Sequence, residues 1–318
     1  MRTLLIGYKG YWGKNILRNI KSCPTATLVS AVDINSSPED RNILGNDVDI
    51  RSDLASALIG SDRLDAAIIV TPSETHCDLA EQCLNAGLSV LLEKPMVLSV
   101  EETDRLSQVA YPSNQKVGVD HTFLFDTKVR VIKDVIDSGR IGKILSVQST
   151  RANLGLFNNN GVVWDLAPHD IALTDYLFGG SLNIETVVAK DNIRSGVTDT
   201  VSIFGSYGDI SYGLNLSWLY PKKVRDFVIV GTKGMIEYDM LSQEPLIIYD
   251  KVAEYKDKKW AHDYTWKSVY NGPPGEPLAL LISEFSDWVD GRSDSFISDF
   301  ESGLSVVETI EEINTYIY

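Results

Sequence analysis

Two short segments of the sequence place proton-transferring side chains next to a proline. The first is Glu93-Lys94-Pro95, which directly follows an apolar run. An ammonium group such as that of Lys94 can exchange a proton with an alcohol or stabilise a developing alkoxide. Pro95 restricts the backbone of Lys94 and fixes the direction of the turn. The alternative is a lysine of a surface loop with no chemical role.

The second segment runs from Trp164 to Asp170 and holds an acid and an imidazole four residues apart. Asp165 and His169 share one face if this segment is helical. Because proline is tolerated in the first turn of a helix, Pro168 predicts a regular helix that begins near Ala167. The side chains of Asp165 and His169 can also converge if both lie within the helix. An imidazole relays protons near neutral pH. A purely structural His–Asp pair is the alternative.

Three glycines, Gly7, Gly10 and Gly13, stand between a short apolar run and a helical pattern. Glycines there permit a tight turn whose N–H groups approach a pyrophosphate, with the positive end of the following helix behind it. Asp33 follows the next apolar run, where a carboxylate binds ribose hydroxyls and repels a 2′-phosphate, which favours NAD over NADP. A glycine turn with an exposed aspartate is the alternative. Lys9 either contacts phosphate or is solvated.

The elements that must position these residues alternate in type over the first third of the chain. Near-continuous apolar strands between helical segments indicate a parallel sheet covered on both faces, a doubly wound α/β Rossmann domain. The predicted strands are 3–7, 27–33, 65–70, 88–92 and 116–119, and the predicted helices are 13–21, 73–86 and 99–110.

The remaining chain predicts a second domain rich in strands. Successive strands with helices to one side indicate an α+β domain on a large, mostly antiparallel open sheet. The predicted strands are 144–149, 186–189, 200–207, 210–218, 226–230, 235–238 and 246–249, and the predicted helices are 162–178, 277–289 and 301–316. We therefore expect a dinucleotide-binding domain over 1–120 and a substrate-binding and oligomerisation domain over 121–318.

Composition excludes several classes of protein. The 318 residues carry 29 Lys and Arg against 44 Asp and Glu, a formal net charge of −15, which argues against nucleic acid as a partner. No apolar run is long enough for a membrane helix, and the start does not have the pattern of a signal peptide, so we expect a cytoplasmic protein without membrane contact. Three cysteines at unsuitable spacing predict neither a disulfide framework nor a metal site.

Taken together, these segments resemble the Gfo/Idh/MocA family, which includes glucose-fructose oxidoreductases and inositol dehydrogenases. The resemblance covers nearly the whole chain, and Glu-Lys-Pro with the later Asp-x-x-x-His is its most diagnostic part. The matching segments are Gly7 to Gly13, Asp33, 70–76, 93–95, 117–121, 165–170 and the late turn 230–237. The glycine turn is one residue longer than the common family form.

The resemblance implies roles for individual residues. Lys94 and His169 would be the catalytic pair, and Asp165 would orient or bind the substrate. Glu93 would border the nicotinamide, and the family's sheet often packs against a second subunit, which implies a homodimer or homotetramer. The implied cofactor-binding residues are Gly7, Gly10, Tyr11, Trp12, Gly13, Asp33, Thr71, Pro72, His76, Glu93, Lys94 and Pro95.

Within the family, Tyr11–Asn15 and the segment around Asp165 look like the branch that acts on UDP-linked N-acetylamino sugars or their uronates. Arg151 and Asn153 are similar to that branch's Arg-x-Asn segment, and they would hold a carboxylate or sugar hydroxyls beside Lys94, Asp165 and His169. The expected reaction is NAD-dependent interconversion of a secondary alcohol and a ketone on a sugar or nucleotide sugar. The alternatives are an inositol or free-sugar dehydrogenase, an NAD-dependent glycosidase, a reductase of a non-sugar substrate and a non-catalytic NAD-binding sensor.

Overall fold

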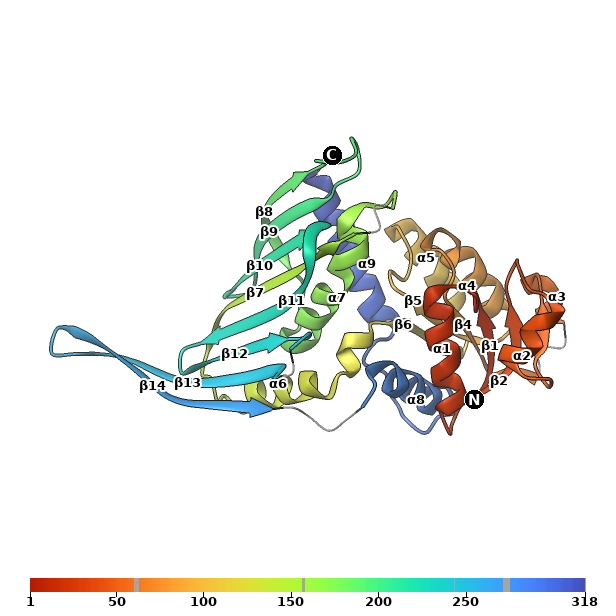
Figure 1. Ribbon diagram of the computed structural model, residues 1–318, viewed down its shortest axis with the longest axis horizontal. Helices are drawn as coiled ribbons and strands as arrows, with labels where there is room; N and C mark the ends of the chain where they lie inside the picture. The colour runs from red at the N-terminus through yellow and green to blue at the C-terminus, as the bar shows by residue number, and fades with distance from the viewer. Residues whose placement is uncertain (60–62, 156–157, 243, 271–274, 318) are drawn as a thin grey trace. The chain divides into compact units, whose positions relative to one another are not determined.

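The computed structural model describes residues 1–59, 63–155, 158–242, 244–270 and 275–317, with side chains at all of these positions except 251–256 and 260–266. The chain divides into two compact units. The first comprises Met1–Phe125 and Gly275–Glu308, and the second Asp126–Pro274 and Thr309–Tyr318. Figure 1 shows the helices and strands of both units, most of them labelled.

The first unit is built on a parallel sheet, which has six strands in the described part of the chain. Their order, β3-β2-β1-β4-β5-β6, is that of a doubly wound fold, in which the strand order reverses at β1 and β4. Ligands of such sheets bind beyond the carboxyl ends of the strands near that reversal. The strands are β1 (Arg2–Ile6), β2 (Thr27–Val32), β3 (Asp49–Arg51), β4 (Ala66–Ile69), β5 (Ser89–Glu93) and β6 (Val117–Asp120).

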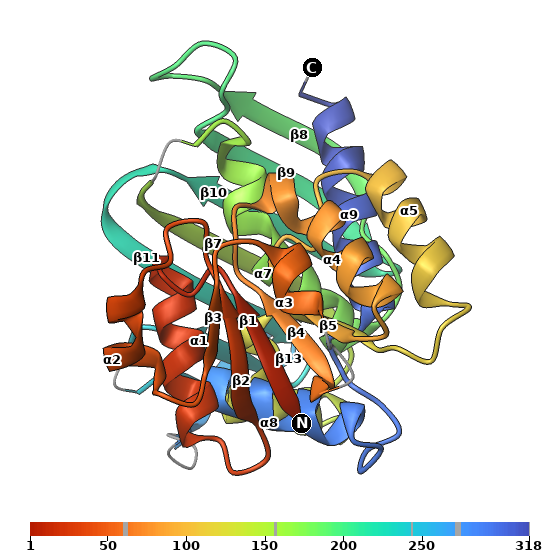
Figure 2. The same ribbon diagram turned by 90° about the vertical axis from the view of Figure 1, so that its right-hand side faces the viewer.

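Helices cover both faces of this sheet, which explains its apolar strands. Every residue of β4 is at most 1% exposed, as a strand covered on both faces must be. Because crossover connections are right-handed, α1 and α4, which lead to strands on opposite sides of the reversal, cover opposite faces (Figure 2). The helices are α1 (Tyr11–Ser22), α2 (Arg41–Leu44), α3 (Leu54–Leu58), α4 (His76–Asn85) and α5 (Val100–Ala110), with 3₁₀ turns η1 (Pro38–Asp40), η3 (Ser73–Thr75) and η4 (Thr122–Phe125).

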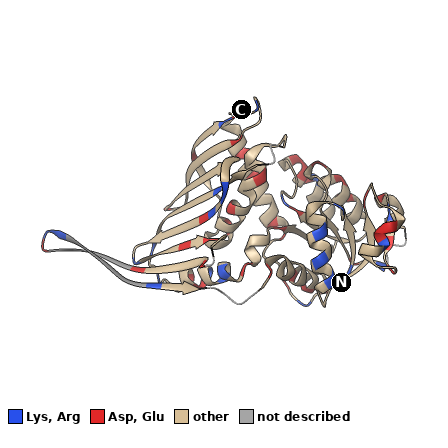
Figure 3. Ribbon diagram, in the orientation of Figure 1, with Lys and Arg blue, Asp and Glu red and all other residues tan. Residues whose placement is uncertain are grey.

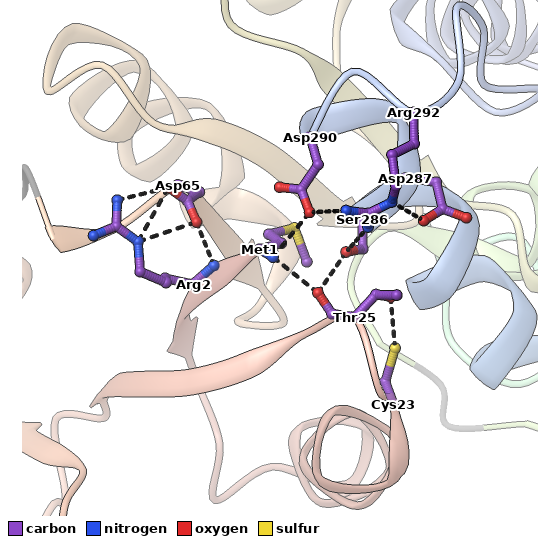
Figure 4. A network of polar contacts seen from close by, with 9 residues as sticks. All are labelled: Met1, Arg2, Cys23, Thr25, Asp65, Ser286, Asp287, Asp290 and Arg292. Carbon is purple, nitrogen blue, oxygen red and sulfur yellow. Dashed lines mark hydrogen bonds and ion pairs between the residues drawn. The ribbon is translucent and has the colours of Figure 1, made fainter.

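The chain returns to the first unit near its end. Helix α8 (Pro277–Val289) packs against α1 and buries Phe285 completely. The N-terminal ammonium donates to the carbonyl oxygen of Thr25 at 2.8 Å and pairs with Asp290 at 3.1 Å, and the Ser286 hydroxyl donates to the same carbonyl at 2.7 Å (Figure 4). The sequence analysis places 275–308 in the second domain, whereas packing joins it to the first unit, because apolar periodicity does not specify which surface a helix covers.

The second unit has one large sheet, with eight strands among the described residues in the order β14-β13-β12-β11-β7-β10-β9-β8. Only the β7–β10 pair is parallel, so the fold class expected from the sequence is confirmed. Helix α7 (Gly161–Phe178) packs on β7, β9 and β10. The strands are β7 (Ile144–Leu154), β8 (Asn183–Lys190), β9 (Thr200–Tyr207), β10 (Ile210–Ser217), β11 (Leu219–Gly231), β12 (Gly234–Asp239), β13 (Leu246–Lys256) and β14 (Lys259–Tyr270).

Five helices and strands of the structure have no counterpart in the sequence analysis. They are strand β3, which is only three residues long, helices α2, α3 and α6 (Thr127–Asp137), and strand β14. Helix α7 begins at Gly161, so the expected start near Ala167 is wrong, and Pro168 lies inside the helix. A single internal proline removes one backbone donor, and the turns on either side of it continue the helix.

The helix α9 (Phe300–Thr315) contributes residues to both units. Across the described residues, no helix has both the length and the apolar character that a bilayer span requires.

Candidate functional site

The glycine turn after β1 has the close backbone approaches that exclude larger residues. Gly7 has a φ of +90°, and a Cβ atom there would lie 2.9 Å from the carbonyl oxygen of Val70. At Gly13 a Cβ atom would lie 2.2 Å from the carbonyl oxygen of Gly7. Gly10 is the N-cap of α1, and a Cβ atom there would meet nothing closer than 3.4 Å. The turn therefore brings the first N–H groups of α1 to the carboxyl edge of the sheet.

A cavity of about 460 Å³ opens beside this turn within the first unit. Its lining joins five of the expected cofactor residues, which are Gly7, Gly10, Asp33, Thr71 and Pro72. The sequence analysis missed Asn35, Ser52, Asp53 and Thr75, which also line it. A dinucleotide fits this arrangement of a cavity, a glycine turn without room for Cβ atoms at Gly7 and Gly13, and a carboxylate that follows β2.

Asp33, which the sequence predicts at the ribose, lies next to Lys9 of the glycine turn. The carboxylate of Asp33 accepts hydrogen bonds from the backbone N–H groups of Asn35 at 3.0 Å and Lys9 at 3.2 Å. The Lys9 ammonium pairs with Asp40 at 2.8 Å, and the Tyr8 hydroxyl donates to the same carboxylate. These contacts lower the pKa of Asp40 to about 2, with the Lys9 hydrogen bond as the largest cause. Lys9 is thus tied to Asp40 rather than simply solvated, and its contact with phosphate stays a prediction.

His76, which the resemblance implies at the cofactor, lies between two turns of the backbone. Its side chain is completely buried, and its two ring nitrogens lie 3.0 Å from the carbonyl oxygens of Pro95 and Thr71. Burial lowers the pKa of this imidazole, so the neutral form is favoured. His76 therefore joins two turns at the carboxyl edge of the sheet, and its burial argues against direct contact with a ligand.

Two aromatic side chains expected at the cofactor lie at the start of α1. Tyr11 is 78% exposed and Trp12 is 40% exposed, and their rings meet edge to face with centroids 5.5 Å apart. Neither belongs to the described lining of the cavity. Their role as cofactor residues stays a prediction.

Lys94 follows β5 at the same edge of the sheet and is surrounded by titratable groups. The bond from Lys94 to Pro95 is cis. Glu93 and Asp120 end neighbouring parallel strands in paired register, and Asp120 is only 2% exposed. Burial, followed by mutual repulsion, raises the pKa of Glu93 well above its ordinary value, and burial also raises the pKa of Asp120. The charge of Lys94 opposes both shifts, which places the ammonium close to the carboxyl pair.

His121 completes this cluster, and the sequence analysis did not assign it a role. Its imidazole is 1% exposed, with Nδ1 3.0 Å from the Ser298 hydroxyl. Burial and the neighbouring charge of Lys94 lower the pKa of His121 to about 3, so this histidine is neutral near pH 7. The signal available in the sequence was the pair Asp120-His121 directly after a buried strand.

In the second unit, Asp165 and His169 lie one turn apart on α7, as their spacing predicts. Both side chains are partly buried. The indole N–H of Trp218 donates to Asp165 at 2.9 Å, which fixes the direction of that carboxylate.

Arg151 is held by a carboxylate of its own unit. Its guanidinium pairs with Asp170, the residue after His169, and each side chain is 1% exposed. The Ser149 hydroxyl also donates to Asp170, at 2.6 Å. Such a buried pair anchors α7 to β7, and it argues against the expected role of Arg151 as a direct substrate ligand. Asn153, two residues further along β7, instead accepts a hydrogen bond from Arg225, which the sequence analysis missed.

The fold and the turn define a class: an oxidoreductase-type Rossmann unit joined to an α+β unit with an open sheet. The family described as "Oxidoreductase family, NAD-binding Rossmann fold" matches residues 1–121, and the GFO/IDH/MocA C-terminal domain matches residues 129–237. The chain belongs to the Gfo/Idh/MocA family of oxidoreductases.

Curated relatives support this assignment over different lengths. An oxidoreductase from Formosa agariphila is 35% identical, but the match covers 43% of this chain and 48% of that protein. The scyllo-inositol 2-dehydrogenase (NAD(+)) of Bacillus subtilis is 27% identical over 99% of this chain and 93% of its own. The inositol 2-dehydrogenase of Rhizobium meliloti is 23% identical over 76% of this chain and 72% of its own.

Solved structures share the whole fold. A putative oxidoreductase from Magnetospirillum magnetotacticum superposes with a TM-score of 0.80 at 26% identity and covers 98% of both chains. The UDP-N-acetylglucosamine 3-dehydrogenase GnnA from Acidithiobacillus ferrooxidans has the same TM-score at 20% identity, covering 99% of this chain and 97% of its own. At that identity the likeness concerns the fold alone.

Proposed function

We propose that this protein is an NAD-dependent oxidoreductase that interconverts a secondary alcohol and a ketone on a sugar. The observation that carries the proposal is the shared edge of the first sheet. The glycine turn, Asp33 and the cavity lie there, and Lys94 follows β5 at the same edge. A dinucleotide site and a proton-transferring group at one edge suit the oxidation of an alcohol.

We propose NAD rather than NADP as the cofactor, because Asp33 ends β2 at the cavity and a carboxylate there repels a 2′-phosphate. When bound, NAD supplies the hydride acceptor. Lys94 takes the proton of the substrate hydroxyl or stabilises the oxyanion. His169 is the second proton-transferring group, and Asp165, held by Trp218, orients it or binds a sugar hydroxyl.

For the substrate we propose a UDP-linked N-acetylamino sugar or its uronate. The segments around Tyr11 and Asp165 support this branch. An inositol or free sugar is the second candidate, because relatives that span 72% and 93% of their own length are named inositol dehydrogenases.

We also propose that the open sheet of the second unit forms a homodimer or homotetramer interface. Large apolar side chains are exposed on its strands, among them Val188 at 54% and Phe204 at 47%. Light scattering should give a multiple of the 35.2 kDa chain mass, and a monomer at micromolar concentration would contradict the interface.

A Lys94→Ala variant tests the assignment of the chemistry. It should bind NAD with nearly unchanged affinity, measured by fluorescence titration, while kcat falls at least about a hundredfold, as expected for a lost acid–base group. Lys116→Ala removes a lysine at the opposite end of the same sheet and should leave both quantities unchanged. A Lys94→Ala variant with near wild-type kcat would show that Lys94 is not the proton-transferring group.

A further inference from the structure

Lys223 and Arg225, two basic residues of β11, lie close together, and neither forms an ion pair with a carboxylate of the described residues. Arg225 is 8% exposed, and its guanidinium donates to the carbonyl oxygens of Ala152 and Val224 and to the side-chain oxygen of Asn153. These acceptors are neutral. Within the described part of the chain, neither Arg225 nor Lys223 has a carboxylate at ion-pair distance.

A third cation strengthens the positive field around this pair. In the antiparallel register of β11 with β7, Arg225 lies directly opposite Arg151. Burial and the charge of Arg151 lower the pKa of Arg225 to about 10. Burial, Arg225 and Arg151 also lower the pKa of Lys223. Among the described residues, Arg151 pairs with Asp170, whereas Arg225 and Lys223 have no ion-pair partner, although the charges of Asp170 and Asp165 partly offset the shift at Arg225.

This arrangement is costly for the isolated chain. Like charges directly opposite each other on neighbouring strands destabilise a sheet. A buried cation without a counter-ion loses hydration that neutral acceptors replace only in part. Such a cluster in a chain of net charge −15 indicates a site that an anionic ligand completes.

The cluster also lies beside the residues of the second unit that the proposed function uses. The charge of Asp165 acts on Arg225, and Asn153 contacts it directly. Asp165 is held on α7 by the indole of Trp218. A ligand bound at Arg225 would therefore lie next to the carboxylate proposed to orient the substrate.

We propose that Arg225, Lys223 and Asn153 form a subsite for an oxyanion of the substrate, either a carboxylate or a phosphate. A guanidinium fork and an ammonium suit such a group, and the Asn153 amide adds a neutral polar contact. The inference rests on the proposed function and names its substrate class, an anionic sugar derivative rather than a neutral polyol. In this proposal the arginine that binds the anion is Arg225 rather than Arg151, because Asp170 already neutralises Arg151.

The test measures binding rather than turnover. The NAD-loaded wild-type protein is titrated calorimetrically with four ligands. Glucose carries no oxyanion, glucuronate carries a carboxylate, UDP-glucose carries phosphates, and UDP-glucuronate carries both. At least one anionic ligand should bind about tenfold or more tightly than glucose, as one charge-assisted contact implies. If glucuronate binds more tightly than glucose and UDP-glucose does not, the subsite binds a carboxylate. If UDP-glucose binds more tightly and glucuronate does not, the subsite binds a phosphate.

Variants then assign the effect to these side chains. Lys223→Gln and Arg225→Gln should each weaken the favoured anionic ligand about fivefold or more and leave glucose unchanged. Lys222→Gln is the matched control, because it removes the same charge from the next residue, and it should bind as the wild type does. If Arg225→Gln does not fold, the exposed Lys223 position still decides the question.

The inference is overturned if glucose binds as tightly as every anionic ligand, or if Lys223→Gln and Lys222→Gln bind identically. The proposed function fails in a different way. If no sugar yields NADH while anionic ligands bind and Lys223→Gln weakens them, the subsite stands and the dehydrogenase reaction does not. If neutral polyols are oxidised and the variants have no effect, the reaction stands and the subsite does not.

Discussion

Two carboxyl groups beside Lys94 illustrate how neighbouring residues set each other's protonation. Glu93 and Asp120 are adjacent across β5 and β6, and burial and repulsion raise the pKa of Glu93. An acid whose pKa is higher in the folded state keeps a proton that the unfolded chain releases above about pH 4.5. The contribution of Glu93 to the free energy of unfolding is therefore highest below that pH and falls as the pH rises toward the raised pKa.

Asp120→Asn should flatten this pH dependence. The amide keeps an oxygen for the Thr122 hydroxyl but removes the charge that repels ionised Glu93. Between pH 5 and pH 8, the free energy of unfolding should fall more steeply with pH for the wild type than for the variant, because the variant lacks the repulsion that helps to raise the pKa of Glu93. Urea denaturation at several pH values measures this loss.

The control is Asp104→Asn, which removes an exposed carboxylate from α5 with the same change in charge. Its pH dependence should follow that of the wild type. Parallel curves for the wild type and Asp120→Asn would mean that Asp120 does not repel Glu93 in the folded protein.

Arg151 shows where residue-level prediction stops. The sequence indicates a substrate ligand at this position, but the structure pairs it with Asp170. The partner sits on a helix nineteen residues later, and the contact depends on how α7 packs on β7. Arg225 and His121 were missed for the same reason, because their environments come from neighbouring strands rather than from local sequence.

At the scale of elements, the turn between β1 and α1 depends on backbone approach. The sequence pattern of Gly7, Gly10 and Gly13 predicted this turn, because a glycine-rich segment between a strand and a helix has few other structural uses. The structure distinguishes the three positions: Gly13 has no room for a Cβ atom, whereas Gly10 has nearly enough.

Gly13→Ala should therefore displace the start of α1. Its Cβ atom would lie 2.2 Å from the Gly7 carbonyl oxygen and 2.7 Å from Tyr8 backbone atoms, which cannot yield as a flexible side chain does. We expect a loss of about 1–3 kcal/mol in stability, as for other overpacked sites, and at least tenfold weaker NAD binding. Gly275→Ala is the control, since a Cβ atom there meets nothing closer than 3.7 Å. Unchanged NAD affinity in Gly13→Ala would contradict the close approach at this turn.

Element types were more predictable than their limits. The long apolar strands and α8, predicted at 277–289 and found at Pro277–Val289, carry strong periodic signals. Helix α7 was predicted from Val162, but Pro168 then suggested a later start, and tertiary packing on β7 and β10 overrides that local preference. Strand β14 was missed because its register depends on pairing with β13.

At the scale of the whole molecule, the net charge of −15 describes the chain only on average. Figure 3 shows acidic and basic residues interspersed on both units. The three cations Arg151, Lys223 and Arg225 lie in the second unit, and Lys94 follows β5 in the first. The protein thus concentrates positive charge at the positions where small anions are proposed to bind, while its surface as a whole repels polyanions.

The central claim, NAD-dependent oxidation of a sugar alcohol, is tested most directly by the absorbance of NADH. The purified protein is incubated with NAD⁺ or NADP⁺ and, in turn, UDP-N-acetylglucosamine, its uronate, myo-inositol and free glucose. We predict NADH formation with at least one of these, most rapidly with an anionic nucleotide sugar, and much slower reaction with NADP⁺. Failure of all four substrates to yield reduced cofactor, in a protein shown to bind NAD, would contradict the account.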